Sequence, residues 1–140
     1  MRRFSSGTSW ERIVGYSRAV AAGDFVIVSG CTSVDGAEFV HPGDAYAQTV
    51  QAIGNAAAGL AGLGASLADV IQTRMYVTDI SLWRDYGRAH GEAFGQVRPA
   101  TSMVQVAALI EPEMLIEVEV VAYRPGIGRQ SQPVGRPLVR

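Results

Sequence analysis

The stretch RPATSMVQVAALIEPEMLIEVEVVAY, from Arg98 to Tyr123, decides the fold. Glu117 and Glu119 stand two residues apart in its second half. Because side chains alternate between the two faces of a strand, both carboxylates point to one face of a sheet. The residues around them are those of a buried sheet, namely Ile116, Val118, Val120, Val121 and Ala122. We expect two strands joined by a short turn, and the use of the two acids depends on what covers their face.

The sequence before this stretch predicts more strands, separated by turn residues. YSRAVA (16–21) and FVIVSG (25–30) flank the turn Gly23–Asp24 and predict a hairpin. Residues 38–40 predict a short strand between the turn at 34–36 and the break at 41–43. Residues 71–78 alternate apolar and polar side chains, which is typical of a strand.

Two helices are expected between these strands. Asp44 is a suitable N-cap for the first, which should stop near Gly62 or Gly64. Its apolar residues recur at helical spacing, at Tyr46, Val50, Ile53, Ala57 and Leu60. Ser81 is expected to cap the second helix. Its apolar stripe is Leu82, Tyr86, Ala89 and Ala93, and its polar side is Arg84, Asp85, Arg88 and Glu92.

The order of elements predicts an α+β fold, with a mixed sheet and two helices on one face. Both faces of FVIVSG and IEVEVVA are largely apolar, and two helices cover only one face of the sheet. The second face therefore needs a cover from outside the chain. We expect a homo-oligomer, with small-molecule sites in the crevices between subunits.

The chain divides into one domain and a tail. Length and hydrophobic content fit a single domain over residues 1–123. Residues 124–140, RPGIGRQSQPVGRPLVR, are rich in proline, glycine and arginine and hold too few apolar groups to offset the entropy of ordering them. This basic tail is expected to be flexible by itself.

Composition excludes several classes of protein and site. No window is long and apolar enough for a membrane span, and no apolar core of a signal peptide follows the first arginines. A cytoplasmic location is expected. One cysteine, Cys31, and two distant histidines, His41 and His90, make a metal site or other cofactor site unexpected.

The basic and acidic residues exclude further kinds of chemistry and disfavour one class of partner. All twelve basic residues are arginine, so lysine Schiff-base chemistry, a pyridoxal anchor and a phosphate-loop lysine are impossible. Between Phe4 and Tyr123 six arginines face thirteen acids, a charge of about −7 that repels phosphate backbones. Nucleic acid is therefore an unfavourable partner.

Several short motifs together resemble the RidA/YjgF family, also labelled endoribonuclease L-PSP. They are Gly15-Tyr16, Val28-Ser29-Gly30, the run TRMYVTD (73–79), Arg98-Pro99-Ala100 and Ile116-Glu117-Val118-Glu119, in this order and at this spacing. The resemblance covers residues 12–123. It implies a chorismate-mutase-like fold and a homotrimer with a central barrel and three inter-subunit clefts. The activity it implies is the hydrolysis of reactive enamines and imines to a ketoacid and ammonia.

The resemblance also implies the residues of the cleft. Glu117 corresponds to the glutamate thought to position the attacking water, and Tyr16, Ser29 and Gly30 match positions near the ligand. The family's carboxylate-binding arginine is replaced by Thr101. A charge-assisted bidentate hydrogen bond of that kind contributes roughly 1.5 to 3 kcal/mol to binding, whereas threonine offers one hydroxyl donor. Hydrolysis of ketoacid imines is thus in question for this divergent sequence.

Two further positions depart from the family, and one of them offers a substitute cation. Met103 replaces a frequent cysteine, and Arg88 replaces an asparagine on the second helix. Arg88 either reaches the cleft or is a solvated residue between Asp85 and Glu92.

The roles of the other chemically active side chains are interpreted as follows, with two interpretations open for some of them. Glu117 and Glu119 either serve the cleft or form the wet face of an edge strand. Cys31 is interpreted as a small core or cleft-wall residue rather than a nucleophile. His41 is expected in a loop and His90 packed on a helix. Tyr16 either closes the pocket or packs at an interface.

Three functions remain open from the sequence. The first is a deaminase-type hydrolase acting on a small imine or enamine through Glu117 and water. The second is a non-catalytic trimer that binds a small molecule or a protein in the same clefts. The third is a ribonuclease, which the acidic body and the lack of a histidine pair disfavour.

Overall fold

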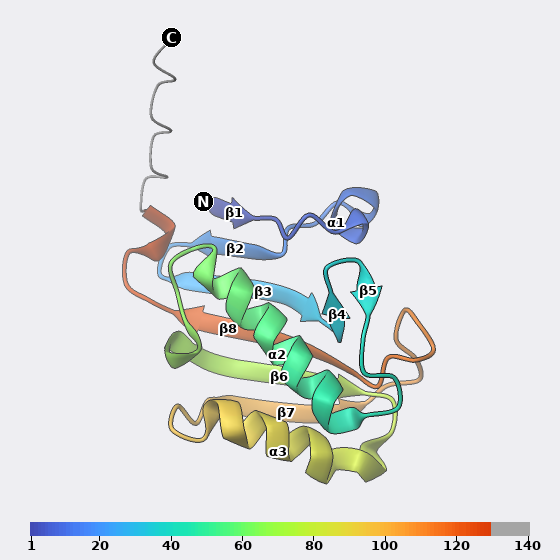
Figure 1. Ribbon diagram of the computed structural model, residues 1–140. Coiled ribbons are helices and arrows are strands. Elements are labelled where there is room, and N and C mark those ends of the chain that lie inside the picture. Colours follow the sequence, from blue (N-terminus) through green and yellow to red (C-terminus); the bar gives the residue numbers. More distant parts are fainter. Residues whose placement is uncertain (130–140) are drawn as a thin grey trace.

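Six strands form one mixed sheet in the computed structural model, which describes residues 1–129 (Figure 1). The strand order is β1–β2–β3–β8–β6–β7. Their bounds are β1 Arg2–Phe4, β2 Ala19–Ala22, β3 Phe25–Cys31, β6 Val70–Val77, β7 Ala100–Gln105 and β8 Ile116–Tyr123. A separate small hairpin pairs β4 (Val34–Asp35) with β5 (Glu38–Phe39).

Two long helices lie over one face of this sheet, as expected. They are α2 (Ala45–Ala61) and α3 (Trp83–Phe94), which lie beside each other in Figure 1. A short helix, α1 (Ser9–Val14), lies beyond the start of β2, and one-turn helices span Leu67–Asp69, Ile80–Leu82 and Ile127–Arg129. None of the helices in residues 1–129 is long and apolar enough to cross a membrane. The predicted α+β class is confirmed.

The last two strands do not form the hairpin that we expected from residues 98–123. β7 pairs in parallel with β6, and β8 runs antiparallel between β3 and β6. The unit β6–α3–β7 is a crossover, which places its two strands parallel and adjacent. Residues 106–115 then lead around β6, so the short-turn prediction was wrong.

The predicted apolar stripe of α2 is confirmed in part. Ile53 and Leu60 are buried in the core, whereas Val50 is 47% exposed. Gln48, Thr49 and Gly59, which the stripe leaves out, are buried as well. A Cβ placed on Gly59 lies only 3.3 Å from Val28 Cγ1, which shows how closely the helix approaches β3. This close approach favours a small residue at position 59, which apolar spacing alone does not predict.

The cap of the second helix was predicted two residues too late. The Asp79 carboxylate accepts hydrogen bonds from the Ser81 N–H at 3.0 Å and from the Ser81 hydroxyl at 2.6 Å. Asp79 thus caps the one-turn helix Ile80–Leu82, and α3 continues from Trp83. Ser81 is the donor in this cap, not the capping acceptor.

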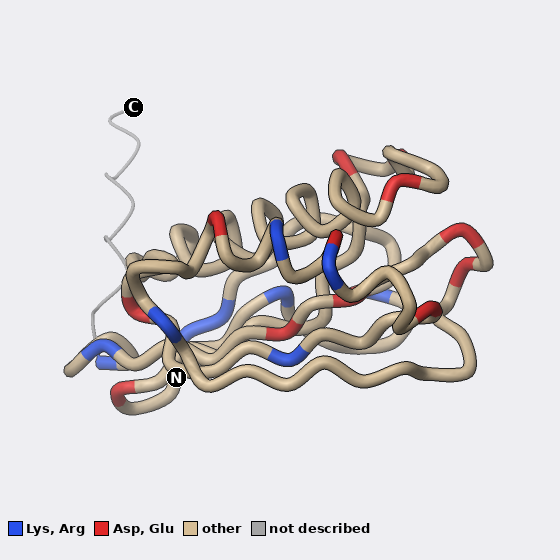
Figure 2. Tube along the Cα trace, turned by 90° about the horizontal axis from the view of Figure 1, so that it is seen from below, with Lys and Arg blue, Asp and Glu red and all other residues tan. Residues whose placement is uncertain are grey.

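The face of the sheet opposite α2 and α3 is partly apolar and exposed. Ile27 is 54% exposed, Val104 47%, and Phe25 and Tyr123 contact each other edge to face at 5.3 Å between ring centroids. Figure 2 shows both long helices on the upper side of the sheet, and no part of residues 1–129 covers its lower side. These residues thus leave uncovered the face for which the sequence predicted an external cover.

Ordered contacts continue past Tyr123. Ile127 is fully buried, and the Gly126 N–H donates to Asp24 Oδ1 at 2.8 Å. Arg2 donates to the carbonyl of Ile127 at 3.0 Å, which joins the two ends of the described chain. The body therefore includes residues 124–129, and the rest of the expected tail lies outside the described residues.

The segment before β2 is held by a buried glutamate, Glu11, which is 6% exposed. Its carboxylate accepts hydrogen bonds from the Ser6 N–H at 3.2 Å, from the Ser6 hydroxyl and from the Thr8 hydroxyl at 2.8 Å. Burial raises the pKa of Glu11, but these hydrogen bonds outweigh it and lower the pKa to about 2.

We expect Glu11 to make the fold sensitive to acid. A folded-state pKa below the unfolded value contributes stability that is present above the unfolded value and lost as the pH falls toward 2. Glu11→Gln should lower the free energy of unfolding at pH 7 by about 2 kcal/mol. Urea unfolding of both proteins at pH 7 and pH 3 measures this, and an undiminished difference at pH 3 contradicts it.

Candidate functional site

A cavity of about 680 Å³ opens where β2 begins and β3 ends, next to α1. Four residues that the sequence predicted for the site line it together: Tyr16, Ser29, Gly30 and Glu117. They come from the segment before β2, from β3 and from β8. The fold therefore gathers these four side chains around one space, although they are far apart in sequence.

A bulge in β3 makes room for Glu117. The register of β3 against β8 shifts between Val28 and Cys31, so that Ser29 and Gly30 both stand opposite Glu119. A Cβ placed on Gly30 would lie 2.6 Å from Cδ of Glu117. Glycine at this position is therefore a steric requirement for the carboxyl group to sit where it does.

We expect Gly30→Ala to displace the Glu117 carboxyl group. The added methyl overlaps the side chain, which has to rotate away at a cost of roughly 1 to 3 kcal/mol. Ligand binding in the cavity and any turnover should fall more than tenfold, while thermal unfolding shifts by a few degrees only. Gly54→Ala is a matched control, because nothing lies within 4 Å of a Cβ at Gly54. Equal effects of the two changes would contradict the steric role.

Burial tunes the acidity of Glu117. Removal from water and the nearby carboxylate of Glu119 raise its pKa above 4.5, and the positive charge of Arg18 opposes them. A carboxylate with a raised pKa accepts a proton from water more readily than an ordinary carboxylate and can return it during a reaction. The interpretation of Glu117 as part of a fully wet edge strand does not fit, because β8 is an inner strand.

Arg18 is the buried cation of the cavity. It is 9% exposed, and its Nη1 donates to the carbonyls of Ser29 at 3.1 Å and Gly30 at 2.6 Å. Its Nη2 donates to the hydroxyl of Tyr16 at 3.3 Å. Arg18 thus contacts three of the residues that the sequence placed in the site, and it fixes the bulge that accommodates Glu117.

Sequence reasoning did not select Arg18. The signal was present in YSRAVA, where one arginine interrupts an apolar strand. A fully charged side chain in a buried strand requires several acceptors, and bulge carbonyls supply them here. The pattern of residues 16–21 predicts a hairpin strand, and by itself it gives Arg18 no functional role.

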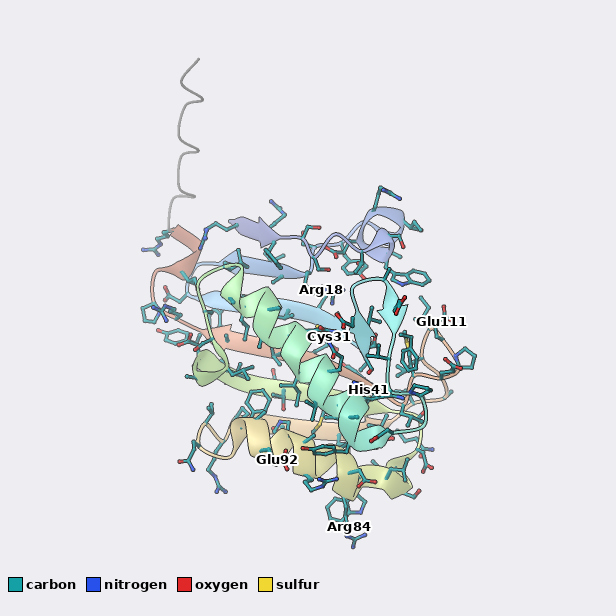
Figure 3. The ribbon with its side chains drawn as sticks, viewed as in Figure 1. Arg18, Cys31, His41, Arg84, Glu92 and Glu111 are labelled. Atoms are coloured by element: carbon teal, nitrogen blue, oxygen red, sulfur yellow. The ribbon has the colours of Figure 1, made fainter. Side chains whose placement is uncertain are left out.

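Cys31 lies beside Arg18 in the lining of the cavity (Figure 3). The thiol is 3.5 Å from Arg18 Nη1, and Cys31 is 3% exposed. Burial raises the pKa of the Cys31 thiol, with Arg18 opposing this. A protonated, buried thiol is a poor nucleophile, which agrees with the core or wall interpretation.

Thr101 and Met103 lie away from this cavity in the single chain, on the edge strand β7. Thr101 forms a hydrogen bond with Thr73 at 2.8 Å between hydroxyl oxygens, and Thr73 forms a second with His90 Nε2, also at 2.8 Å. Burial lowers the pKa of His90. Thr101, which the resemblance matched to the family arginine, is thus part of a polar hydrogen-bonded chain.

Arg88 also lies outside the cavity, on the exposed side of α3. Its guanidinium stands over the ring of Tyr46 at 3.8 Å and 4.0 Å from the carboxylate of Asp85. Both partners belong to the helical layer, so the contacts match the solvated interpretation of this residue. His41 is exposed in the loop before α2, as expected.

Within residues 1–129 no cluster of three or more histidine, cysteine, aspartate or glutamate side chains could hold a metal ion. The polar groups that line the cavity include the Glu117 carboxyl group, the Arg18 guanidinium and the hydroxyls of Tyr16 and Ser29. Such a set can hold a small anion and transfer protons.

Comparison with known proteins identifies relatives over most of the chain. The model of the family Endoribonuclease L-PSP matches residues 7–124. SCO2049 from Streptomyces coelicolor is 43% identical over 124 residues, with 89% of this chain and 92% of that protein covered. The 3-aminoacrylate deaminase RutC from Acinetobacter baylyi is 37% identical over 112 residues, with 77% and 86% covered.

Solved structures show the same architecture. Rv2704 from Mycobacterium tuberculosis, a member of the YjgF/YER057c/UK114 family, superposes with a TM-score of 0.80 at 48% identity and covers 87% of this chain and 98% of its own. The YjgF gene product from E. coli gives 0.78 at 26% identity, with 89% and 99% covered. The chain therefore belongs to the endoribonuclease L-PSP family, which is the RidA/YjgF family that its motifs resemble.

Proposed function

We propose that the protein hydrolyses a small imine or enamine that carries a carboxylate. The observation that carries this proposal is the position of Glu117, held against Gly30 in the cavity that Arg18 shares. The 37% identity to a 3-aminoacrylate deaminase supports the same reaction class. Residues with a perturbed carboxyl pKa in a cavity are frequent proton-transfer groups in enzymes.

The proposed mechanism assigns the reaction to two charged groups. Arg18 attracts the substrate carboxylate, since a guanidinium has five N–H donors and the bulge carbonyls and Tyr16 leave donor capacity. Glu117 accepts a proton from water as the water oxygen bonds to the imine carbon. Glu117 returns this proton to the nitrogen, which gives a carbinolamine. It then transfers the hydroxyl proton to the nitrogen as the carbon–nitrogen bond breaks, and the products are a 2-oxo acid and ammonia.

We also propose a homotrimer as the active form. The exposed apolar residues on the open sheet face, including Ile27 and Val104, support burial against other copies. In such an assembly the β7 edge of a neighbour, with Thr101 and Met103, completes each cleft. Thr101 then contributes a hydroxyl and not a cation, and Arg18 remains the cation next to Glu117.

A binding role without turnover is the second candidate. The observation in its favour is Thr101, because its neutral hydrogen-bonded chain stands where the family holds the substrate carboxylate with an arginine. A cavity of this kind can bind a small anion tightly and still lack the transition-state contact that catalysis needs. The ribonuclease suggested by the family description lacks a comparable observation.

Hydrolysis of imino acids generated in situ tests the proposal. An amino acid oxidase with catalase produces the imine, and the protein competes with semicarbazide, so turnover lowers the rate of semicarbazone formation. We expect the rate of turnover to fall as the pH is lowered, because only the ionised form of Glu117 accepts the proton. The midpoint of this acid limb should lie above pH 4.5, because the pKa of Glu117 is raised. Semicarbazone formation unchanged at all pH values would reject hydrolysis and leave the binding role.

A further inference from the structure

The cavity has an apolar end that the reaction does not require. Trp10 and Val14 of α1 and Ile110 of the loop 106–115 line the same space as Glu117. They are 39%, 66% and 62% exposed, so their side chains face open space in this chain. Exposed apolar groups of this size beside a charged centre are typical of a binding surface.

The apolar end is held in a fixed position. Buried Glu11 binds Ser6 and Thr8 at the start of α1, and Gly15 closes the helix in the left-handed conformation, with its N–H donating to the Glu11 carbonyl. Trp10 and Val14 are four residues apart and share one face of the helix. A short segment with this many anchors keeps its apolar side chains in place before a ligand arrives.

Outside this apolar end the surface becomes acidic. A second hollow continues from the cavity past Trp10 and is lined by Glu111 and Glu113. Figure 2 shows acidic residues on the loops at the right-hand end of the molecule, where Glu111 also lies in Figure 3. A ligand that reaches this far with a second carboxylate meets repulsion.

We propose that Trp10, Val14 and Ile110 form a side-chain subsite that selects monocarboxylic imino acids with a large apolar substituent. This inference rests on the proposed function for the reacting group and adds the substrate class. The carboxylate and the imine carbon lie at the Arg18 and Glu117 end. The apolar substituent packs on Trp10, and a second carboxylate is excluded by Glu111 and Glu113.

Binding of stable 2-oxo acids measures the subsite without turnover. In calorimetric titrations we expect 4-methyl-2-oxopentanoate and phenylpyruvate to bind at least about tenfold more tightly than pyruvate, because each buried methylene adds severalfold to the affinity. 2-Oxoglutarate should bind no better than pyruvate. We call the ratio of the affinities for these large apolar oxo acids and for pyruvate the gradient. Trp10→Ala and Val14→Ala should each reduce this gradient to less than about threefold.

Ile13→Ala is the matched control. Ile13 lies on the same helix and is 70% exposed, but it does not line the cavity. The gradient should persist in this variant. A gradient that Ile13→Ala removes as well, or that Trp10→Ala leaves intact, overturns the subsite. A lower oligomer mass of Trp10→Ala in light scattering, without a gradient in the parent, assigns the surface to another copy of the chain and also overturns it.

Turnover of the corresponding imino acids separates this inference from the proposed function. A binding gradient together with faster turnover of leucine-derived than of alanine-derived imine supports both. A binding gradient without turnover of any imine supports the subsite and rejects the hydrolase. Equal turnover of both imines with equal affinities for the oxo acids supports the hydrolase and rejects the subsite, and a flat gradient without turnover rejects both.

Discussion

Glu117→Gln should lower kcat for imino acid hydrolysis by about 100- to 10,000-fold. Glutamine keeps the size of the side chain beside Gly30 and removes its ability to accept a proton. KM should change little, because the proposed contact with the substrate carboxylate belongs to Arg18. Steady-state rates from semicarbazide competition give both parameters. A variant with more than a tenth of the parental kcat would remove Glu117 from the mechanism.

Glu119→Gln is the matched control for this change. Glu119 lies on the same face of β8, two residues along, and does not line the cavity. Because the Glu119 carboxylate raises the pKa of Glu117, its neutralisation should move the acid limb of the rate profile to lower pH. The rate at pH 7 should stay close to that of the parent.

Arg18→Met should have the largest effect on stability, a loss of about 3 kcal/mol in the free energy of unfolding. The change leaves the carbonyls of Ser29 and Gly30 without their donor in a partly buried bulge. Methionine fills part of the volume, so the loss is chiefly one of hydrogen bonds and charge. Urea unfolding curves give the difference, provided that the slopes agree.

The pH dependence of activity in Arg18→Met gives a second measurement, which would not change if Arg18 had a purely structural role. Arg18 lowers the pKa of Glu117, so its removal should shift the acid limb of any residual activity to higher pH. Arg84→Met is the control, because Arg84 stacks on exposed Trp83 at the surface. It should stay within about 0.5 kcal/mol of the parent with an unshifted limb. An unshifted limb in Arg18→Met would leave that residue a structural role only.

Local pattern predicted the elements better than their pairing. The alternation of residues 71–78 and 116–123 and the cap at Asp44 identify β6, β8 and α2 correctly. The pairing of β7 with β6 depends on the crossover through α3, which alternation within either strand does not record. Short α1 was missed, although Thr8 and Glu11 have the spacing of a capping box.

The site was predictable in part, for a similar reason. Glu117, Ser29, Gly30 and Tyr16 were selected through motifs, and the structure brings them to one cavity. Arg18 gains its role only from a bulge in β3, and single-strand periodicity gives no sign of that bulge. The neighbour that supplies Thr101 in the proposed trimer is likewise a property of that assembly, which the sequence of one strand does not encode.

The ionisation of Glu117 tests the central claim most directly. Carbon-13 NMR of the side-chain carboxyl groups, assigned by comparison with Glu117→Gln, gives its pKa in the native protein. We expect a pKa above 4.5 that rises further in Arg18→Met and responds to a bound 2-oxo acid. A pKa at or below 4.5 that neither change affects would place the carboxyl group in open water and contradict a catalytic role for the cavity.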